Sequence, residues 1–242
     1  RRSSDLPHLT PQLFQLEYNS ENVSMFPAII NTIFMIILSL LIAGPLGIFA
    51  AVYLVEYAKK GNKLVSVVRV TAETLTGIPS IVYGLFGMLF FVTTLRWGYS
   101  MLAGAFTLAI MVLPVIMRTT EEALLAVPDT YREASFGLGA GKLRTIFVVI
   151  LPSAVPGIFS GVILSIGRIV GETAALMYTA GTVAELPDSV MSSTRTLSVH
   201  MYSLASEGLY INQAYATAVV LLVIVLVINW LSGRIARRIK KG

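Results

Sequence analysis

The sequence predicts an all-α, polytopic transmembrane helical bundle with five membrane spans. Of its 242 residues, 55% are hydrophobic and only 13% are charged, whereas an average soluble domain has about 25% charged residues. A helix needs about 20 consecutive apolar residues to cross the hydrocarbon layer of a bilayer. Apolar stretches of this length lie at Pro27–Val55, Thr74–Leu95, Trp97–Met117, Thr145–Gly167 and Gly208–Gly233.

Two other structures would also contain apolar segments, but neither fits these stretches. A buried helix of a soluble protein explains any single stretch, yet it is a poor explanation of five. Strands of a transmembrane β-barrel would be about ten residues long and would alternate apolar with polar residues. These runs are continuous and rich in Leu, Ile, Val and Ala. Because backbone in lipid must satisfy its own hydrogen bonds, the runs are expected to be helices.

The first three spans contain helix-breaking residues. We expect Gly44-Pro45 to break the first span and Gly77-Ile78-Pro79-Ser80 to break the second, and Pro114 lies within the third. Proline removes a backbone donor and kinks a helix. In membranes such breaks are tolerated where protein or a water-filled cavity meets the freed groups. The breaks therefore indicate either a functional pathway or kinks that serve only packing.

Positive charges gather in three stretches that alternate with the spans, at residues 58–69, 118–144 and 233–242. Because cytoplasmic loops of membrane proteins collect Lys and Arg, we expect these stretches and the C-terminus to be cytoplasmic. The same rule explains the net charge of +5 without a nucleic-acid partner. Residues 1–26 would then be an external segment, and one further span is expected upstream because the chain starts at Arg1 outside the membrane.

The connection after the third span predicts a compact knob. Its helix is expected to begin at a capping box of Thr130 and Glu133, with Asp129 as a competing cap. Three glycines should end this helix, before the chain re-enters an apolar run at Leu151-Pro152. Tyr131 and Phe136 would be the apolar anchors of the knob. The glycines are Gly137, Gly139 and Gly141.

The segment Gly137–Lys142 superficially looks like a phosphate-binding loop for ATP. That motif requires GxxxxGK followed by Ser or Thr, between a strand and a helix. Here Phe136 occupies the position of the first glycine, and Leu143 follows the lysine. If ATP drives this protein, another subunit is therefore expected to bind it, and no cofactor is expected in this chain.

The knob resembles the EAA signature of importer-type ABC permeases, which reads EAA, three residues, G, nine residues, then I-x-L-P. Glu133-Ala134-Ser135, Gly139 and Leu151-Pro152 match it, whereas Ser135 replaces the third alanine and Val149 the isoleucine. The resemblance implies a coupling helix, at about residues 129–142, docked in a groove of an ATPase subunit. The contacts it implies are Tyr131, Arg132, Glu133, Ala134, Ser135 and Gly139.

Further motifs over about residues 27–242 resemble phosphate-specific permeases, of the PstA type rather than the PstC type. They are Thr76–Gly84, Leu113-Pro114, Arg118–Leu124, Gly171–Ala174, Arg195–Leu197 and Tyr215–Ala218. The resemblance implies a type I ABC importer permease that forms half of a phosphate pathway in a bacterial inner membrane. The resemblance also implies that the chain is not itself an enzyme. The implied partners are a homologous PstC-type permease, two ATPase subunits that bind ATP and Mg, and an external phosphate-binding protein.

Two charged residues interrupt the apolar segment Thr145–Ala184. Arg168 and Glu172 are four residues apart, which would place them on one helix face. A charge in the membrane is costly and must face protein or water, so the pair indicates either a structural ion pair or an anion path. Guanidinium binds phosphate oxygens bidentately, and Glu172 would balance Arg168 when no anion is present.

Two cations near span ends have simpler interpretations. Arg69 and Glu73 are also four residues apart, and we expect an interfacial structural pair. Arg118 closes the third span, where it either lines the phosphate exit or extends to the interface.

Other functions remain open at this stage. A permease for another oxyanion is one alternative, and a passive channel or secondary transporter would share the spans and charges without needing a coupling helix. A metalloprotease requires paired histidines, whereas the two histidines here, His8 and His200, are far apart. The chain has no cysteine, so we expect neither a disulfide nor a thiolate metal site.

Overall fold

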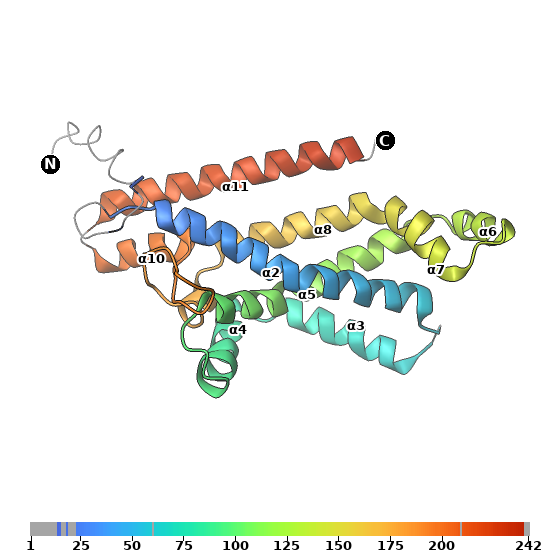
Figure 1. Cartoon of the computed structure of the whole chain (residues 1–242), viewed down its shortest axis with the longest axis horizontal. Coiled ribbons are helices and arrows are strands. Elements are labelled where there is room, and N and C mark those ends of the chain that lie inside the picture. The colour runs from blue at the N-terminus through green and yellow to red at the C-terminus, as the bar shows by residue number, and fades with distance from the viewer. Residues whose placement is uncertain (1–13, 16–17, 19–22, 60, 209, 240–242) are drawn as a thin grey trace. The chain divides into compact units, whose positions relative to one another are not determined.

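The computed structural model describes residues 14–15, 18, 23–59, 61–208 and 210–239 (Figure 1). Within these ranges the regular structure is helical and no strand occurs, which confirms the predicted all-α fold. Most of the predicted external segment, residues 1–26, lies outside the described residues, as do Lys60 and the last three residues.

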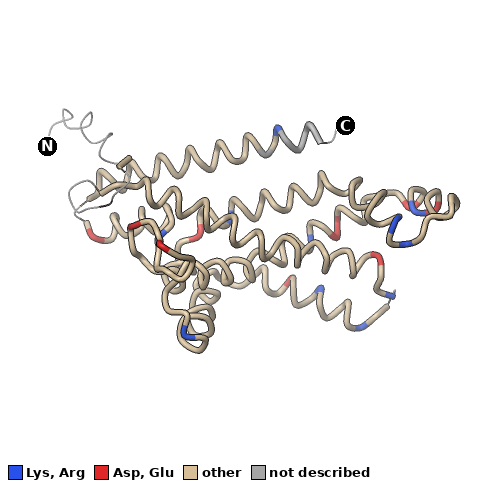
Figure 2. Tube along the Cα trace, viewed as in Figure 1, with Lys and Arg blue, Asp and Glu red and all other residues tan. Residues whose placement is uncertain are grey.

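Four of the five predicted spans are long apolar helices. The first comprises α2 (Phe26–Val52), which the π-helical turn η2 (Tyr53–Tyr57) extends. The next is α5 (Met101–Leu125). Another joins α7 (Lys142–Thr145), η4 (Ile146–Ile150) and α8 (Leu151–Gly171), and the last is α11 (Ile211–Ile239). Figure 2 shows long stretches of these helices without charged residues.

The second predicted span is not a single helix. The chain forms α3 (Lys63–Thr76) and then α4 (Ser80–Gly87) with η3 (Met88–Thr94), and the two directions differ by 104°. The bend lies at the predicted break, where Pro79 fixes its own backbone and disfavours helix at the residue before it. The pair is therefore a broken span or a re-entrant loop, and α3 begins well before the predicted Thr74.

Proline acts differently in the first span. The expected break at Gly44-Pro45 is wrong, because α2 continues from Phe26 to Val52 with Pro45 inside it. Pro114 and Pro156 likewise lie inside α5 and α8. A single proline removes only one donor, and a long apolar helix keeps its remaining hydrogen bonds on both sides. The Gly-Ile-Pro sequence at 77–79 breaks the helix where Gly-Pro alone does not.

The chain divides into two compact units. Unit 1 comprises Arg1–Ser39, Pro79–Ala109 and Arg168–Val227, and unit 2 comprises Leu40–Ile78, Ile110–Gly167 and Ile228–Gly242.

Unit 2 is built on one apolar cluster. Its members come from the end of α2, from η2, α3 and α5, and from the helix η4–α8, with Leu124, Ile146 and Ile150 almost completely buried. Gly157 lets α8 approach α5, because a Cβ there would lie 2.5 Å from the Cβ of Ala123. The cluster thus fixes the helices on which α6 (Asp129–Gly137) is mounted.

Unit 1 is built on close helix contacts and a folded loop. α4 packs on the short helix α9 (Ala174–Met177), where a Cβ on Gly84 would lie 2.8 Å from the Cα of Ala175. The backbone N–H of Ser100 donates to the Thr179 carbonyl at 3.0 Å. The loop after α9 leads to α10 (Leu197–Glu207), which ends at Gly208 in the left-handed region, with φ +70°.

Candidate functional site

The predicted knob consists of α6, a tight turn and α7, and Figure 2 shows that Lys and Arg gather around it. α6 begins at Asp129, with Pro128 at the N-cap position and no side-chain cap. The predicted capping box is therefore wrong, because Thr130 already lies inside the first turn. Proline fixes the backbone that leads into the helix, and the carboxylate of Asp129 in the first turn complements the helix dipole.

The predicted glycine stop is confirmed at Gly139. The N–H of Gly139 donates to the Phe136 carbonyl at 2.9 Å, and the N–H of Ala140 donates to the Ser135 carbonyl at 3.0 Å. This pair of bonds is a Schellman motif. It requires a left-handed residue, and Gly139 has φ +82°. The glycine therefore terminates α6 and reverses the chain toward α7.

Arg132 is the anchor of α6. Its guanidinium donates to Glu56 Oε1 from Nη2 at 2.8 Å and from Nε at 3.2 Å. It also donates to the carbonyls of Leu124 and Val127, at 3.1 and 3.0 Å, and to Asp129. The side chains of Arg132 and Glu56 are only 16% and 9% exposed. Arg132, predicted as a contact to an ATPase, is thus directed into its own subunit.

Ser135 also faces inward. Its hydroxyl lies 2.8 Å from the Thr145 hydroxyl, and both residues are buried. The ammonium of Lys142 lies 4.7 Å from the ring centre of Tyr57 in η2. The serine that replaces the third alanine of the EAA pattern therefore joins α6 to α7.

The outer face of the knob carries apolar side chains. Tyr131 and Phe136 are about half exposed, while Leu138 and Leu143 are 89% and 64% exposed. Glu133, Ala134 and Gly139 are exposed as well. Four of the six predicted contact residues are therefore available to a partner. The sequence analysis did not predict Leu138 and Leu143 as contacts. Their position beside the glycines of the turn could have indicated that they are exposed.

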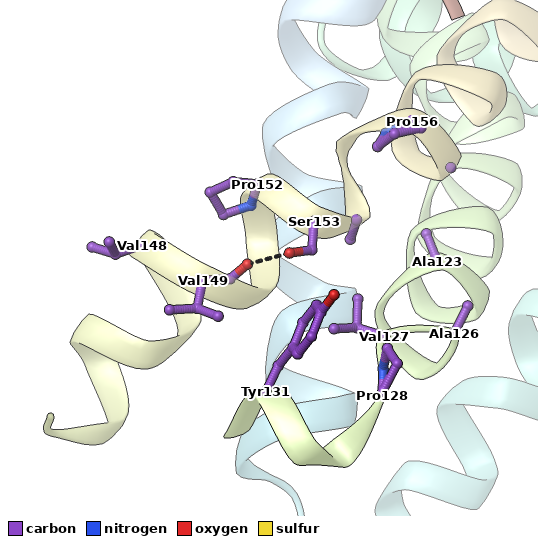
Figure 3. A pocket seen from close by; sticks show the side chains of 12 residues that line it. Ala123, Ala126, Val127, Pro128, Tyr131, Val148, Val149, Pro152, Ser153 and Pro156 are labelled. Carbon is purple, nitrogen blue, oxygen red and sulfur yellow. Dashed lines mark hydrogen bonds between the residues drawn. The ribbon is translucent and has the colours of Figure 1, made fainter. Parts of the chain in front are cut away.

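A groove of about 880 Å³ lies beside the knob in unit 2. Figure 3 shows the ring of Tyr131 among side chains from the end of α5 and from η4–α8. The Ser153 hydroxyl is turned to the Val149 carbonyl, at 2.7 Å, so the lining is largely apolar. Its other members include Val127, Pro128, Val148, Pro152 and Pro156.

A cluster of charges lies at the C-terminal half of α5 and lines a pocket of about 330 Å³ with α3. Arg69 pairs with Glu121 across these helices, so the predicted pairing with Glu73 is wrong. Arg118 pairs with Glu122 at 3.3 Å and lies 4.0 Å from Glu73. The Arg118 side chain is 58% exposed, and both predicted roles for it remain compatible with this position.

Arg168 and Glu172 do not form the predicted pair. α8 ends at Gly171, so the helical four-residue spacing does not apply to Glu172. Glu172 is buried, and its carboxylate accepts the N–H of Ala175 at 3.0 Å, which caps α9. Its carbonyl accepts the Ser198 hydroxyl at 2.6 Å. Arg168 is half-buried in the last turn of α8, where a cation complements the helix dipole.

The sequence profile of the family "binding-protein-dependent transport system inner membrane component" matches residues 43–241. A probable ABC transporter permease protein, YqgI of Bacillus subtilis, is 37% identical over 86% of this chain and 78% of its own length. The phosphate transport system permease protein PstA of Pasteurella multocida is 43% identical over 72% of this chain and 62% of its own length. PstA 1 of Mycobacterium tuberculosis is 41% identical over 65% of this chain, which spans about half (51%) of that relative.

Solved structures share the fold. An inward-facing MetNI methionine ABC transporter chain has a TM-score of 0.67 at 21% identity, over 89% of this chain and 94% of its own. A bacterial alginate ABC transporter chain has a TM-score of 0.69 at 19% identity, over 99% of this chain and 89% of its own. These likenesses confirm the predicted fold of type I ABC importer permeases.

Proposed function

The chain belongs to the family of binding-protein-dependent transport system inner membrane components, and from this premise we propose that it forms half of the phosphate pathway of an ABC importer. Hydrolysis of ATP takes place on separate subunits that hold ATP and Mg. The other partners are a homologous PstC-type permease and an external phosphate-binding protein. The C-terminus is cytoplasmic in this proposal.

The main support for the proposal is the structure of the knob. Its outer face presents Phe136, Leu138 and Leu143 to a partner, while Arg132 fastens its inner face to Glu56 at the end of the first span. An amphipathic helix that docks in a groove requires such an exposed apolar face. A displacement of α6 therefore acts on η2 through the Arg132–Glu56 pair and on α7 through the Ser135–Thr145 contact, and both elements belong to unit 2.

Support for phosphate as the substrate comes from the relatives named PstA and from the chemistry of Arg168. A guanidinium stays charged in a half-buried position and offers paired donors to an oxyanion. Glu172 caps α9 in the same unit, so its role is to hold the end of α8 and the start of α10 in place. Arg118, exposed beside the pocket of α3 and α5, lines the exit.

Uptake by the reconstituted complex tests the proposal. Proteoliposomes that contain this chain, its partner permease and the ATPase subunits should take up radiolabelled phosphate only when ATP and the external binding protein are both supplied. Uptake without ATP would indicate a channel or secondary transporter. A preference for sulfate or molybdate over phosphate would indicate a permease for another oxyanion.

A matched pair of variants tests the coupling face. Leu138→Asp places a charge on the exposed apolar face without disturbing a buried contact, and the ATPase subunits should then no longer copurify. Leu186→Asp, at a residue in unit 1 that is 40% exposed, is the control and should leave copurification unchanged. Normal copurification with Leu138→Asp would refute the proposed docking face.

A further inference from the structure

Unit 1 buries an arginine that no carboxylate among the described residues balances. Arg195 lies in the loop before α10, is 5% exposed, and forms no ion pair with any residue that the structure describes. Among the described residues, its Nε and Nη2 atoms also have no hydrogen-bond partner. Burying a charge without a partner is strongly unfavourable, so native proteins pair such groups. Arg195 therefore requires a counter-charge.

The two atoms without partners define the shape of the missing partner. Nε–H and Nη2–H lie side by side on one edge of the guanidinium and point in parallel directions. This edge is the one that carboxylates and phosphates engage with two oxygens at once. A single acceptor atom, such as one carbonyl oxygen, would leave one of these two N–H donors unpaired.

Contacts in unit 1 hold the backbone of Arg195 and one face of its guanidinium. Its backbone N–H donates to the Val183 carbonyl at 2.9 Å, and its own carbonyl accepts the Asn31 amide at 3.3 Å. The ring of Tyr18 lies 4.8 Å from the guanidinium carbon and meets the His200 ring edge-on at 6.1 Å. The loop and α2 thus hold the backbone of Arg195, and the Tyr18 ring contacts both the guanidinium and the imidazole of His200.

His200 adds a neutral polar group to this site. It is completely buried, and neither ring nitrogen has a partner among the described residues. Burial and the neighbouring charge of Arg195 lower the pKa of His200 to about 3. The imidazole is therefore neutral at pH 7 and offers one N–H donor without adding a second charge.

We propose that Arg195 and His200 form an oxyanion-binding site in unit 1 that does not include Arg168 and that binds a tetrahedral oxyanion such as inorganic phosphate. The guanidinium edge binds two oxygens of the anion, and the imidazole donates to a third. The site does not depend on phosphate being the transported substrate, because a resident counter-ion would satisfy Arg195 equally well.

Equilibrium binding of radiolabelled inorganic phosphate tests the site. The sample is the membrane complex of this chain with its partner subunits, without the external binding protein and at constant ionic strength. Wild type should bind saturably, and Arg195→Gln should weaken this binding by roughly tenfold or more, since charge-assisted bidentate contacts are lost. Arg195→Lys should weaken binding by less, because it keeps the charge and loses the paired donors.

Arg234→Gln is the matched control. Arg234 also lies against an aromatic ring, at 4.5 Å from Trp230, but it is exposed on α11, so its loss should leave binding unchanged. Phosphate that binds the ATPase subunits adds the same amount of bound radiolabel to every variant. Should Arg195→Gln fail to assemble, Arg195→Lys decides the question, because it retains the charge around which the loop folds.

Two results would overturn the site. One is equal phosphate binding by wild type and both Arg195 variants, and the other is no saturable binding by wild type. In the latter case a carboxylate of a partner subunit balances Arg195. Arg168→Gln separates this inference from the proposed function, since it should abolish uptake and leave binding at Arg195 intact. Binding without any phosphate transport would contradict the proposed function alone.

Discussion

At the scale of single residues, the charges of this chain have distinct tasks that their spacing does not reveal. Arg132 and Glu56 are 76 residues apart and form an inward ion pair. Glu172, by contrast, is four residues from Arg168 and leaves the helix to cap α9. The ends of helices and the contacts between them therefore determine which charges pair in this chain. The spacing of two charges in the sequence does not predict whether they form an ion pair.

Removing the partner of Arg132 should loosen α6. Glu56→Gln keeps the shape of the side chain but removes the charge that faces a guanidinium of only 16% exposure. Loss of a charged hydrogen-bond pair costs about 1–3 kcal/mol, so amides of α6 should exchange with solvent roughly tenfold faster or more. Hydrogen exchange measured by mass spectrometry on the purified complex gives this rate.

The control for Glu56 is Glu122, whose side chain is 65% exposed in its pair with Arg118. Exposed pairs contribute about 0–1 kcal/mol, so Glu122→Gln should leave exchange in α6 unchanged. Equal exchange in wild type and Glu56→Gln would show that α6 does not depend on the pair.

Arg168 should be essential for transport and dispensable for assembly. Arg168→Gln removes the charge from a half-buried position, so phosphate uptake should fall to background while the complex is still recovered in normal yield. Lysine at this position should restore part of the uptake, because it keeps the charge without the bidentate donors. Adding Glu172→Gln to Arg168→Gln should not restore transport, since the two side chains are not paired. Full uptake by Arg168→Gln would refute its place in the anion path.

Among the helices, glycine and proline determine two features, which are the turn of the knob after α6 and the bend between α3 and α4. Residues 77–79 stop α3 and redirect the chain by 104°. Gly139 stops α6 through a left-handed residue. Both features were visible in the sequence as helix-breaking clusters, because these residue types restrict the backbone whatever surrounds them. Pro45 is the counterexample, since a lone proline does not stop a long apolar helix.

A substitution at Gly139 separates the steric effect of an added Cβ from the conformational cost of a positive φ. A Cβ at Gly139 would meet no atom within 4 Å, so Gly139→Ala costs only conformational energy. That cost is about 1–2 kcal/mol for a left-handed residue. The variant should therefore lower the copurification of the ATPase subunits with little loss of the folded permease. Pull-down yield and size-exclusion chromatography measure the two effects.

Gly137→Ala is the matched control for Gly139→Ala. Gly137 also has open space at its Cβ position, but it lies inside α6 and its φ is not positive. Alanine there should favour the helix by about 1 kcal/mol, so coupling should be maintained or improved. If both substitutions had the same effect, the left-handed turn would have no special role in docking.

At the scale of the whole molecule, the sequence predicted most of the fold and only part of the site. Apolar run length and charge depletion locate membrane helices because lipid imposes one requirement on every span. The coupling segment was recognisable because its glycines and its EAA pattern lie close together in the sequence. The inward position of Arg132, the partner of Arg69 and the buried Arg195 were not predictable. Each depends on residues brought together only by tertiary folding.

The positions of the three basic stretches also make a prediction for the whole chain. Because Lys and Arg accumulate on the cytoplasmic side, residues 58–69, 118–144 and 233–242 should all face the cytoplasm. The chain has no cysteine, so single cysteines report one position each. Lys63→Cys, Lys142→Cys and Arg234→Cys replace exposed residues of these stretches, and Asp188→Cys replaces an exposed residue of the loop before α10.

In sealed cells, an impermeant thiol reagent applied from outside should label only Asp188→Cys. After the membrane is permeabilised, all four variants should react, which shows that each thiol is accessible in the folded protein. Each span must reverse the side of the membrane on which the next connection lies, so the four positions together test this alternation. Labelling of Lys142→Cys from outside would place the knob opposite the ATPase subunits, so the coupling role proposed for α6 would fail together with the topology.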